Sequence, residues 1–269
     1  MCRLKSGILL RDRAYVPDHD SHDKMLKELG IQDDYVGASE KFVRFELSPE
    51  DDNLLTDVST WVMKVDQDIV PAWFDADRWK YEEIIVDAVR SWSDKHILRD
   101  GKHEKNEGIY YLINDAEITL RDNAQATLMD NSHATLRGNA QATLMDNAQA
   151  TLRGNAQATL RGNAQATLMD NAKAKLLGNA QATLWDNSQA TLWNNAHATL
   201  WGNAQATLLD NAQATLRDNA HATLMGNAQA MLRGNASIGN CKIFENAIVI
   251  SHKDSKVYVS KKWDMEVTS

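Results

Sequence analysis

Hydrophobic and polar residues alternate in a strict pattern between residues 115 and 234. The octad Asn-Ala-Gln-Ala-Thr-Leu-x-Asp/Gly, with small variations, occurs fifteen times in this range without a gap. Inside an octad, apolar residues such as Ala124, Ala126 and Leu128 alternate with polar ones, which is the period of a half-buried strand. The Asp-Asn or Gly-Asn pair between strands favours a turn, because these residues tolerate left-handed backbone angles. Each octad is therefore predicted to form one short strand and one turn.

The octads are expected to stack as a parallel β-solenoid. A helix is excluded, because a period of eight drifts by roughly 80° per repeat and Asn, Gly and Thr are poor helix formers. A strand whose inner face holds one Leu and two Ala cannot bury that face alone, so neighbouring repeats must cover it. The fifteen leucines of the sixth octad position, from Leu120 to Leu232, are expected to carry the core. The octad-initial asparagines are expected to form amide ladders at the corners.

The residues at the variable seventh octad position indicate how many octads form one coil. At a spacing of sixteen, one column is mostly apolar and reads Met129, Met145, Arg161, Leu177, Trp193, Leu209, Met225. The other column reads Arg121, Arg137, Arg153, Met169, Trp185, Trp201, Arg217, Arg233. A spacing of twenty-four mixes both kinds of residue in every column. The fold class predicted is therefore mainly β, a two-sided parallel β-solenoid with 16 residues and two octads per coil, joined to a small N-terminal α+β domain.

Three regions are predicted along the chain. They are an acidic α+β domain over residues 1–108, the octapeptide-repeat solenoid over residues 109–234, and irregular final coils with a C-terminal cap over residues 235–269. All three prolines lie in the first region. Its periodicity predicts helices that start near Ser21 and Asp77, and strands over 42–47 and 61–65. The cap is expected to close with Lys261, Lys262 and Trp263.

The charge balance changes the range of expected partners. Residues 1–114 carry 16 Lys and Arg against 24 Asp and Glu, whereas residues 115–234 carry 8 against 9. Nucleic acid and anionic membranes require a basic surface, so neither is an expected partner. No apolar stretch is long enough for a signal peptide or a membrane span, and a cytoplasmic protein is expected. Cys2 and Cys241 show neither a disulfide framework nor zinc-ligand spacing.

Few residues suggest chemistry. His19 and His22 lie among acidic residues that could ligate a metal, namely Asp18, Asp20 and Asp23, but a solvated helix start explains them better. Asp66 and Asp68 could act as paired carboxylates, although a polar turn is favoured. His133, His197 and His221 replace Gln at an outward repeat position. No enzyme activity, cofactor or metal is predicted, and a site using Asp66, Asp68 or His22 stays open as an alternative.

The two columns are the candidate interfaces. The apolar face consists of Met129, Met145, Leu177, Trp193, Leu209 and Met225, and it is expected to form a homodimer or to be covered by the chain's own N-terminal domain. The Arg/Trp face consists of Arg121, Arg137, Arg153, Trp185, Trp201, Arg217 and Arg233. Trp185 and Trp201 are expected to stack, flanked by Arg153 and Arg217, as anchors for a partner. Drift between duplicated repeats is the competing explanation.

The octad, together with the segments 42–49 (Phe-Val-Arg-Phe-Glu-Leu-Ser-Pro) and 65–74 (Val-Asp-Gln-Asp-Ile-Val-Pro-Ala-Trp-Phe), resembles a group of uncharacterised octapeptide-repeat β-solenoid proteins of gut bacteria and their phages or mobile elements. The resemblance covers most of the chain. Those proteins often carry Val or Tyr in place of Ala and Leu, so the core is expected to be thinner here. The resemblance implies no activity for any residue.

These observations predict a non-enzymatic structural scaffold or protein-interaction module that presents an apolar face and an Arg/Trp face. Its expected partner is a second copy or another protein. One alternative is a phage or mobile-element inhibitor of a host defence or nucleic-acid enzyme that acts through the acidic N-terminal domain. Another is an ice-binding solenoid, because the Thr columns resemble the flat hydroxyl arrays of such proteins.

Overall fold

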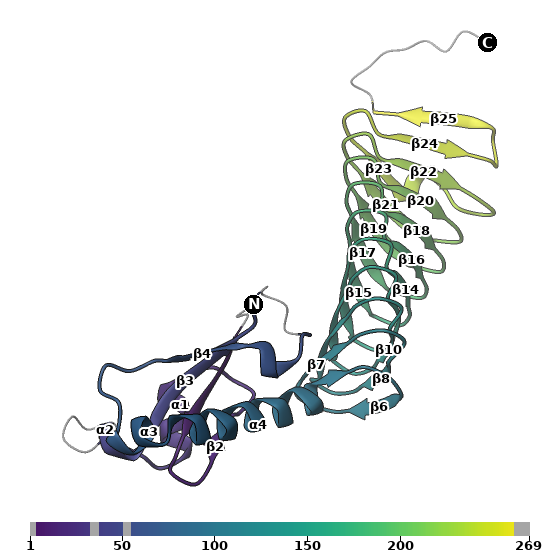
Figure 1. Ribbon diagram of the computed structural model, residues 1–269. Coiled ribbons are helices and arrows are strands. Elements are labelled where there is room, and N and C mark those ends of the chain that lie inside the picture. Colours follow the sequence, from purple (N-terminus) through teal and green to yellow (C-terminus); the bar gives the residue numbers. More distant parts are fainter. Residues whose placement is uncertain (1–3, 33–37, 51–54, 261–269) are drawn as a thin grey trace. The chain divides into compact units, whose positions relative to one another are not determined.

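The computed structural model describes residues 4–32, 38–50 and 55–260 (Figure 1). The chain divides into two compact units, residues 1–97 and residues 98–269.

The N-terminal unit is a four-stranded antiparallel sheet with helices packed on both faces. Its elements are β1 (Lys5–Leu9), β2 (Ala14–Tyr15), α1 (His22–Glu28), α2 (Ala38–Lys41), β3 (Val43–Ser48), a 3-10 turn η1 (Val58–Thr60), β4 (Val62–Val65), α3 (Ala72–Ala76) and α4 (Arg78–His96). The strand order is β2-β1-β3-β4. The two predicted helices and two predicted strands are confirmed as α1, α4, β3 and β4, and the remaining elements were not predicted.

Alternation along the strands divides the core of this unit into two layers. Leu9 and Phe45 face one side of the sheet, where they pack with Tyr81 and Ile85 of α4. On the other side, the neighbouring Ile8 packs with Met25 and Leu26 of α1. Ser21 caps the start of α1 by accepting a hydrogen bond from the Lys24 amide. The acidic start of α1 is therefore a capped, packed helix terminus.

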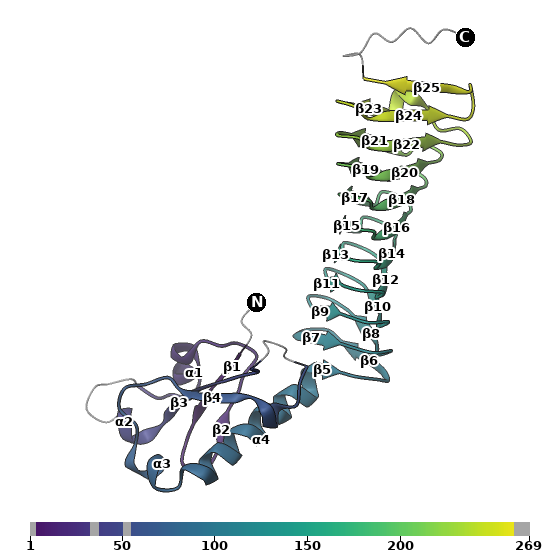
Figure 2. The same cartoon turned by 45° about the horizontal axis from the view of Figure 1, so that its top comes forward.

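The second unit is a parallel β-solenoid in which every octad forms a four-residue strand, as predicted (Figure 2). Before the repeats lie β5 (Ile97–Leu98), β6 (Lys102–Lys105) and β7 (Ile109–Leu112). The repeat strands are β8 (Glu117–Leu120), β9 (Gln125–Leu128), β10 (His133–Leu136), β11 (Gln141–Leu144), β12 (Gln149–Leu152), β13 (Gln157–Leu160), β14 (Gln165–Leu168), β15 (Lys173–Leu176), β16 (Gln181–Leu184), β17 (Gln189–Leu192), β18 (His197–Leu200), β19 (Gln205–Leu208), β20 (Gln213–Leu216), β21 (His221–Leu224) and β22 (Gln229–Leu232). After them come a 3-10 turn η2 (Ile238–Asn240), β23 (Cys241–Ile243), β24 (Ile248–Ser251) and β25 (Lys256–Val259).

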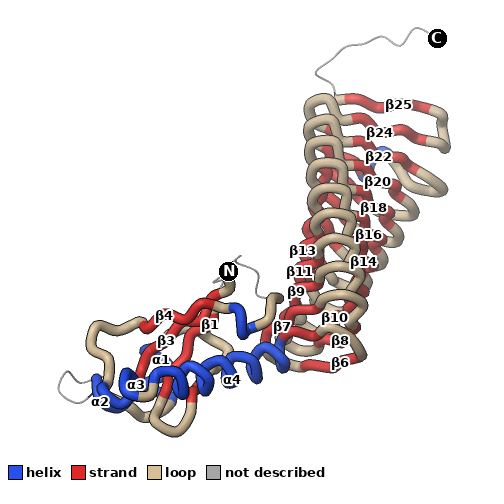
Figure 3. Tube along the Cα trace, in the orientation of Figure 1, coloured by secondary structure: helices blue, strands red, loops and turns tan. Residues whose placement is uncertain are grey.

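The strands form two separate sheets, which gives the solenoid its two sides (Figure 3). The even-numbered strands from β6 to β24, followed by β25, make an 11-stranded sheet, and the odd-numbered strands from β5 to β23 make a 10-stranded sheet. Within the repeats, each residue pairs with the residue sixteen positions later, as Gln141 does with Gln157. The predicted length of sixteen residues per coil is therefore confirmed.

The solenoid core is built from the small apolar positions of the octad. All fifteen leucines of the sixth octad position are 0–1% exposed, and the alanines of the second and fourth positions are buried beside them. The octad-final residue has a positive φ in every repeat, for example 54° at Asp130 and 64° at Gly138. Asp, Asn and Gly alone occupy this position, because other residues avoid the left-handed region.

The corners are joined by aspartates more than by the expected asparagine ladder. Asp170 Oδ2 accepts the amide of Gly154 in the preceding coil at 3.0 Å, and Asp210 accepts the amide of Asn194 in the same way at 3.0 Å. Among the described residues, the only amide-to-amide bond between octad-initial asparagines joins Asn227 to Asn211, and Asn246, beyond the last octad, donates to Asn227 in the same way. The octad-initial asparagines are otherwise exposed, because the turn places the octad-final side chain, not theirs, beside the preceding coil.

The predicted region boundaries need correction at the N-terminal end of the solenoid. The first unit ends at residue 97, not 108, because β6 already pairs in parallel with β8. The sequence Lys-His-Glu-Lys of β6 lacks the small apolar alternation of an octad, so it gave no strand signal.

Beyond the last octad the coil changes length. Cys241 pairs with Ala222, nineteen residues earlier, so this coil holds three more residues than the repeats. The 11-stranded sheet then ends in an antiparallel hairpin of β24 and β25. This hairpin forms the end of the described solenoid, and the expected closing residues Lys261, Lys262 and Trp263 lie outside the described residues.

Candidate functional site

The seventh octad position lies at the corners of the solenoid, immediately after each strand. Its amide bonds to the leucine carbonyl of the preceding coil, as Met145 does with Leu128 at 2.9 Å. Its carbonyl accepts the amide three residues later, as Met145 does from Ala148 at 3.0 Å, which closes the turn. The two variable columns are therefore ridges along two opposite corners, and not broad faces as the sequence suggested. We call them the apolar ridge and the Arg/Trp ridge.

The apolar ridge follows the 10-stranded sheet. Its predicted members are all half-buried, and they are Met129, Met145, Leu177, Trp193, Leu209 and Met225. Exposed Arg161 interrupts the ridge. Sequence reasoning missed Phe244, whose amide bonds to the Leu224 carbonyl at 2.9 Å and which is 46% exposed. The three-residue insertion hides Phe244 from a search at a spacing of sixteen.

The Arg/Trp ridge follows the 11-stranded sheet and contains a continuous stack of planar groups. The rings of Trp185 and Trp201 lie 5.0 Å apart between centroids with an interplanar angle of 8°. The guanidinium carbon of Arg217 lies 4.3 Å from the Trp201 ring centroid. The predicted stacking of the tryptophans and of Arg217 is thus confirmed, but Arg153 does not flank Trp185, because Met169 occupies the coil between them.

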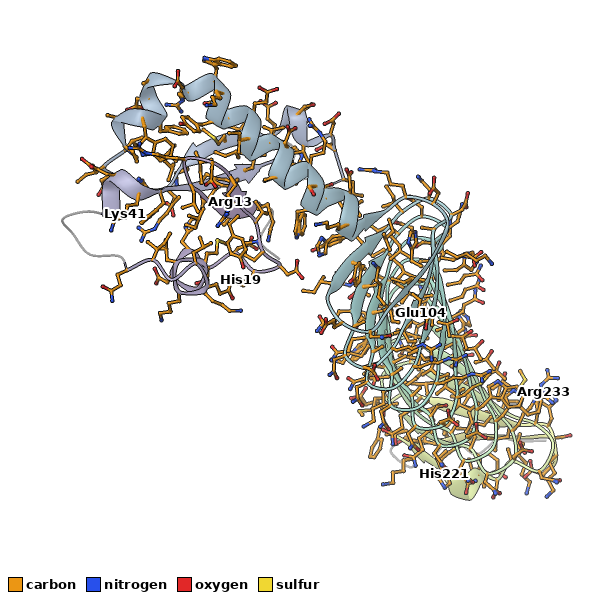
Figure 4. The ribbon with its side chains drawn as sticks, turned by 90° about the horizontal axis from the view of Figure 1, so that it is seen from below. Arg13, His19, Lys41, Glu104, His221 and Arg233 are labelled. Carbon is orange, nitrogen blue, oxygen red and sulfur yellow. The ribbon has the colours of Figure 1, made fainter. Side chains whose placement is uncertain are left out.

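Parts of this ridge remain available to a partner. Trp185 is 39% exposed. The Arg217 Nε is buried and has no hydrogen-bond acceptor among the described residues. At the two ends of the ridge, Arg121 pairs with Glu104, and Arg233 Nε lies 3.2 Å from the sulfur of Met231. Arg137 and Arg153 are exposed between these ends. Figure 4 shows Arg233 projecting outward from the solenoid.

The outer surface of the 11-stranded sheet forms a groove of about 620 Å³. It runs along the Gln and Thr columns, includes His133 and His197, and reaches Met231 and Ile250 at its C-terminal end. The 10-stranded sheet differs, because Lys175 replaces Thr at its centre and His221 lies near its end. The histidines are separated along the rows, as predicted, and they form no cluster with a nucleophile.

The acidic segment before α1 is dispersed into separate ion pairs. Asp20 accepts from the buried Lys5 ammonium at 3.0 Å. Asp18 Oδ1 lies 3.0 Å from Nε2 of His96. His19 and Tyr15 both contact Glu28, at 3.1 and 2.9 Å, and these hydrogen bonds lower the pKa of the Glu28 carboxyl below its usual range. The residues considered as metal ligands thus have different partners, and no metal-ligating cluster is found among the described residues.

The structure brings together one pair that the sequence only suggested. His22 Nδ1 lies 3.2 Å from Asp66 Oδ2, and its Nε2 lies 3.2 Å from the Phe45 carbonyl oxygen. Both ring nitrogens therefore have partners within the fold, which favours a structural role that ties α1 to the sheet. Asp68 is exposed and is not part of this pair. The neighbouring Gln67 side chain bonds to the backbone of Arg44 and Ile69, which fixes the turn after β4.

Cys241 shows no sign of an activated nucleophile. Burial raises the pKa of its thiol to about 11, so the thiol is protonated at neutral pH. Cys2 lies outside the described residues.

No helix in the described part of the chain is both long and apolar enough to cross a bilayer. Comparison with protein-family models, with curated proteins and with solved structures found no match in any of the three, so the geometry of the two units is the basis for a functional conclusion.

Proposed function

We propose that this protein is a non-enzymatic interaction module whose solenoid presents the Arg/Trp ridge to a protein partner. The observation that carries the proposal is the stack of Trp185, Trp201 and Arg217 on three successive coils. Tryptophan and arginine dominate the binding energy of protein interfaces, particularly when they are held in one conformation before binding.

The solenoid supplies that rigidity. The amides of Trp185 and Trp201 bond to leucine carbonyls of the preceding coils at 2.9 Å in each case. Each ring also rests on a neighbour in the stack, so little side-chain entropy remains to be lost on binding. Ridge positions therefore behave as a fixed row of anchors rather than as independent surface side chains.

The chemistry of the ridge favours an acidic partner. Arg217 stacks on Trp201, the exposed Arg153 lies two coils before Trp185, and the chain places no carboxylate at the seventh octad position. The guanidinium groups of these two arginines can form charge-assisted hydrogen bonds with carboxylate oxygens. We infer that the partner contributes carboxylates together with an aromatic or apolar group that covers the exposed part of Trp185.

The ridge can be tested with a defined probe. The protein is titrated by calorimetry with a random Glu/Tyr copolymer, and with a Lys/Tyr copolymer as the opposite-charge control. We expect the acidic polymer to bind the unchanged protein. The Trp185→Ala/Trp201→Ala variant should bind it at least about tenfold more weakly. Added salt should weaken the binding further.

Trp79→Ala is the matched control, because Trp79 is 73% exposed on α4 and lies in the other unit. It should bind the acidic polymer as the unchanged protein does. Equal binding by the ridge variant and the control, or equal binding of both polymers, would contradict the proposal.

The groove on the 11-stranded sheet is hollowed along its Thr column, whereas an ice-binding surface needs a flat array, so ice binding is not proposed further. A role as an inhibitor, a cytoplasmic location and an origin in gut bacteria or phages stay predictions from the sequence. The absence of catalysis is part of the proposal, and turnover that disappears in a His22→Asn protein would overturn it.

A further inference from the structure

The two ends of the 11-stranded sheet have opposite chemical character. At one end, β6 carries Lys102, His103, Glu104 and Lys105. Lys102 pairs with Glu117 at 2.9 Å, and Glu104 pairs with Arg121. Charged residues on an edge strand discourage pairing with another chain. The other end is β25, which has one charged residue, Lys256, followed by Val257, Tyr258 and Val259.

The register of the hairpin shows which way these side chains point. Tyr258 pairs with Val249, which is fully buried, so Tyr258 faces the core. Val257 and Val259 pair with Ile250 and Ile248 and face outward. They are 60% and 46% exposed.

These valines belong to a larger apolar patch. Ile250 also pairs with Met231 of β22, so Val257, Ile250 and Met231 form one row across three strands. In the repeats the same row is threonine, as at Thr215, which pairs with Met231. The apolar replacement is thus confined to the last three strands of the sheet. Among the described residues, β25 has no strand on its outer edge. A contiguous apolar patch beside such an edge is typical of a contact surface.

We propose that β25 pairs in antiparallel fashion with β25 of a second copy of this chain. With Tyr258 at the two-fold axis, Val257 lies opposite Val259 of the partner subunit, and the two apolar patches form one surface across the joint. The backbone groups of the open edge gain partners, and the contact involves the same residues on both copies, so assembly stops at two. Pairing through β6 is disfavoured by its charges. A short edge contact of this kind gives a dissociation constant on the order of micromolar.

Sedimentation velocity on the full chain, from roughly 1 to 500 µM, tests the proposal. The unchanged protein should pass from monomer to dimer over this range. Val257→Lys/Val259→Lys places like charges opposite each other at both positions and should raise the dissociation constant at least about tenfold. Val62→Lys is the matched control, because Val62 is 51% exposed on the edge strand β4 and should leave the dimer unchanged.

A charge-swap variant distinguishes loss of pairing from misfolding. In Val257→Lys/Val259→Glu, each Lys faces a Glu of the partner subunit, so dimerisation should return. Recovery in this variant supports the antiparallel register. A monomer at every concentration, a dimer that persists in the double-lysine variant, or failure of the charge swap to restore it would each overturn the proposal. None of these outcomes depends on the Arg/Trp ridge, so the two proposals fail separately.

Discussion

The two units solve the problem of core formation in different ways. The N-terminal unit buries a few large side chains, such as Phe45, Phe74 and Ile85, which meet from distant parts of the sequence. The solenoid buries many small ones, with one Leu and two small residues per octad, each contacting equivalent residues in the next coil. A globular core concentrates stability in a few irreplaceable residues, whereas a repeated core spreads it along the chain. This difference determines how much stability a single substitution removes and how far along the chain the loss extends.

The largest expected effect is the loss of Phe45. Its ring is fully buried and packs directly over Gly7 of β1, where no side chain would fit. Phe45→Ala should destabilise the N-terminal unit by about 3–5 kcal/mol, because a large cavity opens between the sheet and α4. Hydrogen exchange should show lost protection in β1, β3 and α4. Comparable loss of protection in β14 would show that the two units do not fold separately.

A core leucine of the solenoid should have a smaller and more local effect. Leu168→Ala is expected to cost about 2–4 kcal/mol, because Ala neighbours cannot move to fill the space. Protection should fall most in β12, β14 and β16, which carry the adjacent coils. Leu209→Ala, at a half-buried ridge position, is the control and should cost less. An equal loss of protection in every coil would contradict the view that each coil is stabilised mainly by its immediate neighbours.

The smallest expected changes in stability concern Ser132 and Ser188, two serines that replace Ala at the second octad position. Ser132 Oγ donates to the Met129 carbonyl at 2.7 Å, whereas Ser188 Oγ is buried with no partner among the described residues. Ser188→Ala should therefore stabilise the solenoid by about 1 kcal/mol, and Ser132→Ala should leave it unchanged or cost up to about 1 kcal/mol. The midpoint temperature of thermal unfolding should rise in the Ser188→Ala variant and should stay unchanged or fall in the Ser132→Ala variant. Equal shifts would show that the Ser188 hydroxyl does find a partner.

Predictability also differs between the two units. The octad alone was enough to predict the strands, their register and the buried leucines, because the same strand-and-turn pattern occurs fifteen times. The N-terminal sheet was predicted only in part. Its strand β1 carries Lys5 and Ser6, both buried, and Lys5 is accommodated by its ion pair with the distant Asp20 and by the ring of Trp92. Such a pairing leaves no periodic signal.

The candidate sites followed the same rule. The columns at a spacing of sixteen indicated the Trp185–Trp201 stack correctly, but they could not show that the seventh position lies at a corner, because turn geometry decides this. The outward valines of β25 escaped prediction, since the three-residue insertion and the reversal of strand direction break the period. The pairing of His22 with Asp66 depends on how α1 packs on the sheet, which the local sequence does not encode.

The alternation of strands between two sheets has a consequence for how such a gene can change length. Gain of sixteen residues adds a whole coil and loss of sixteen removes one. In both cases every later side chain stays on its original corner. Gain or loss of a single octad would transfer all later octads to the opposite sheet. A deletion of residues 139–146, for example, would place Trp185, Trp201 and Arg217 in line with Met129 and would bring the other column behind Arg137. The stack of Trp185, Trp201 and Arg217 would survive such a deletion, but its alignment with the residues before position 139 is kept only when octads are gained or lost in pairs.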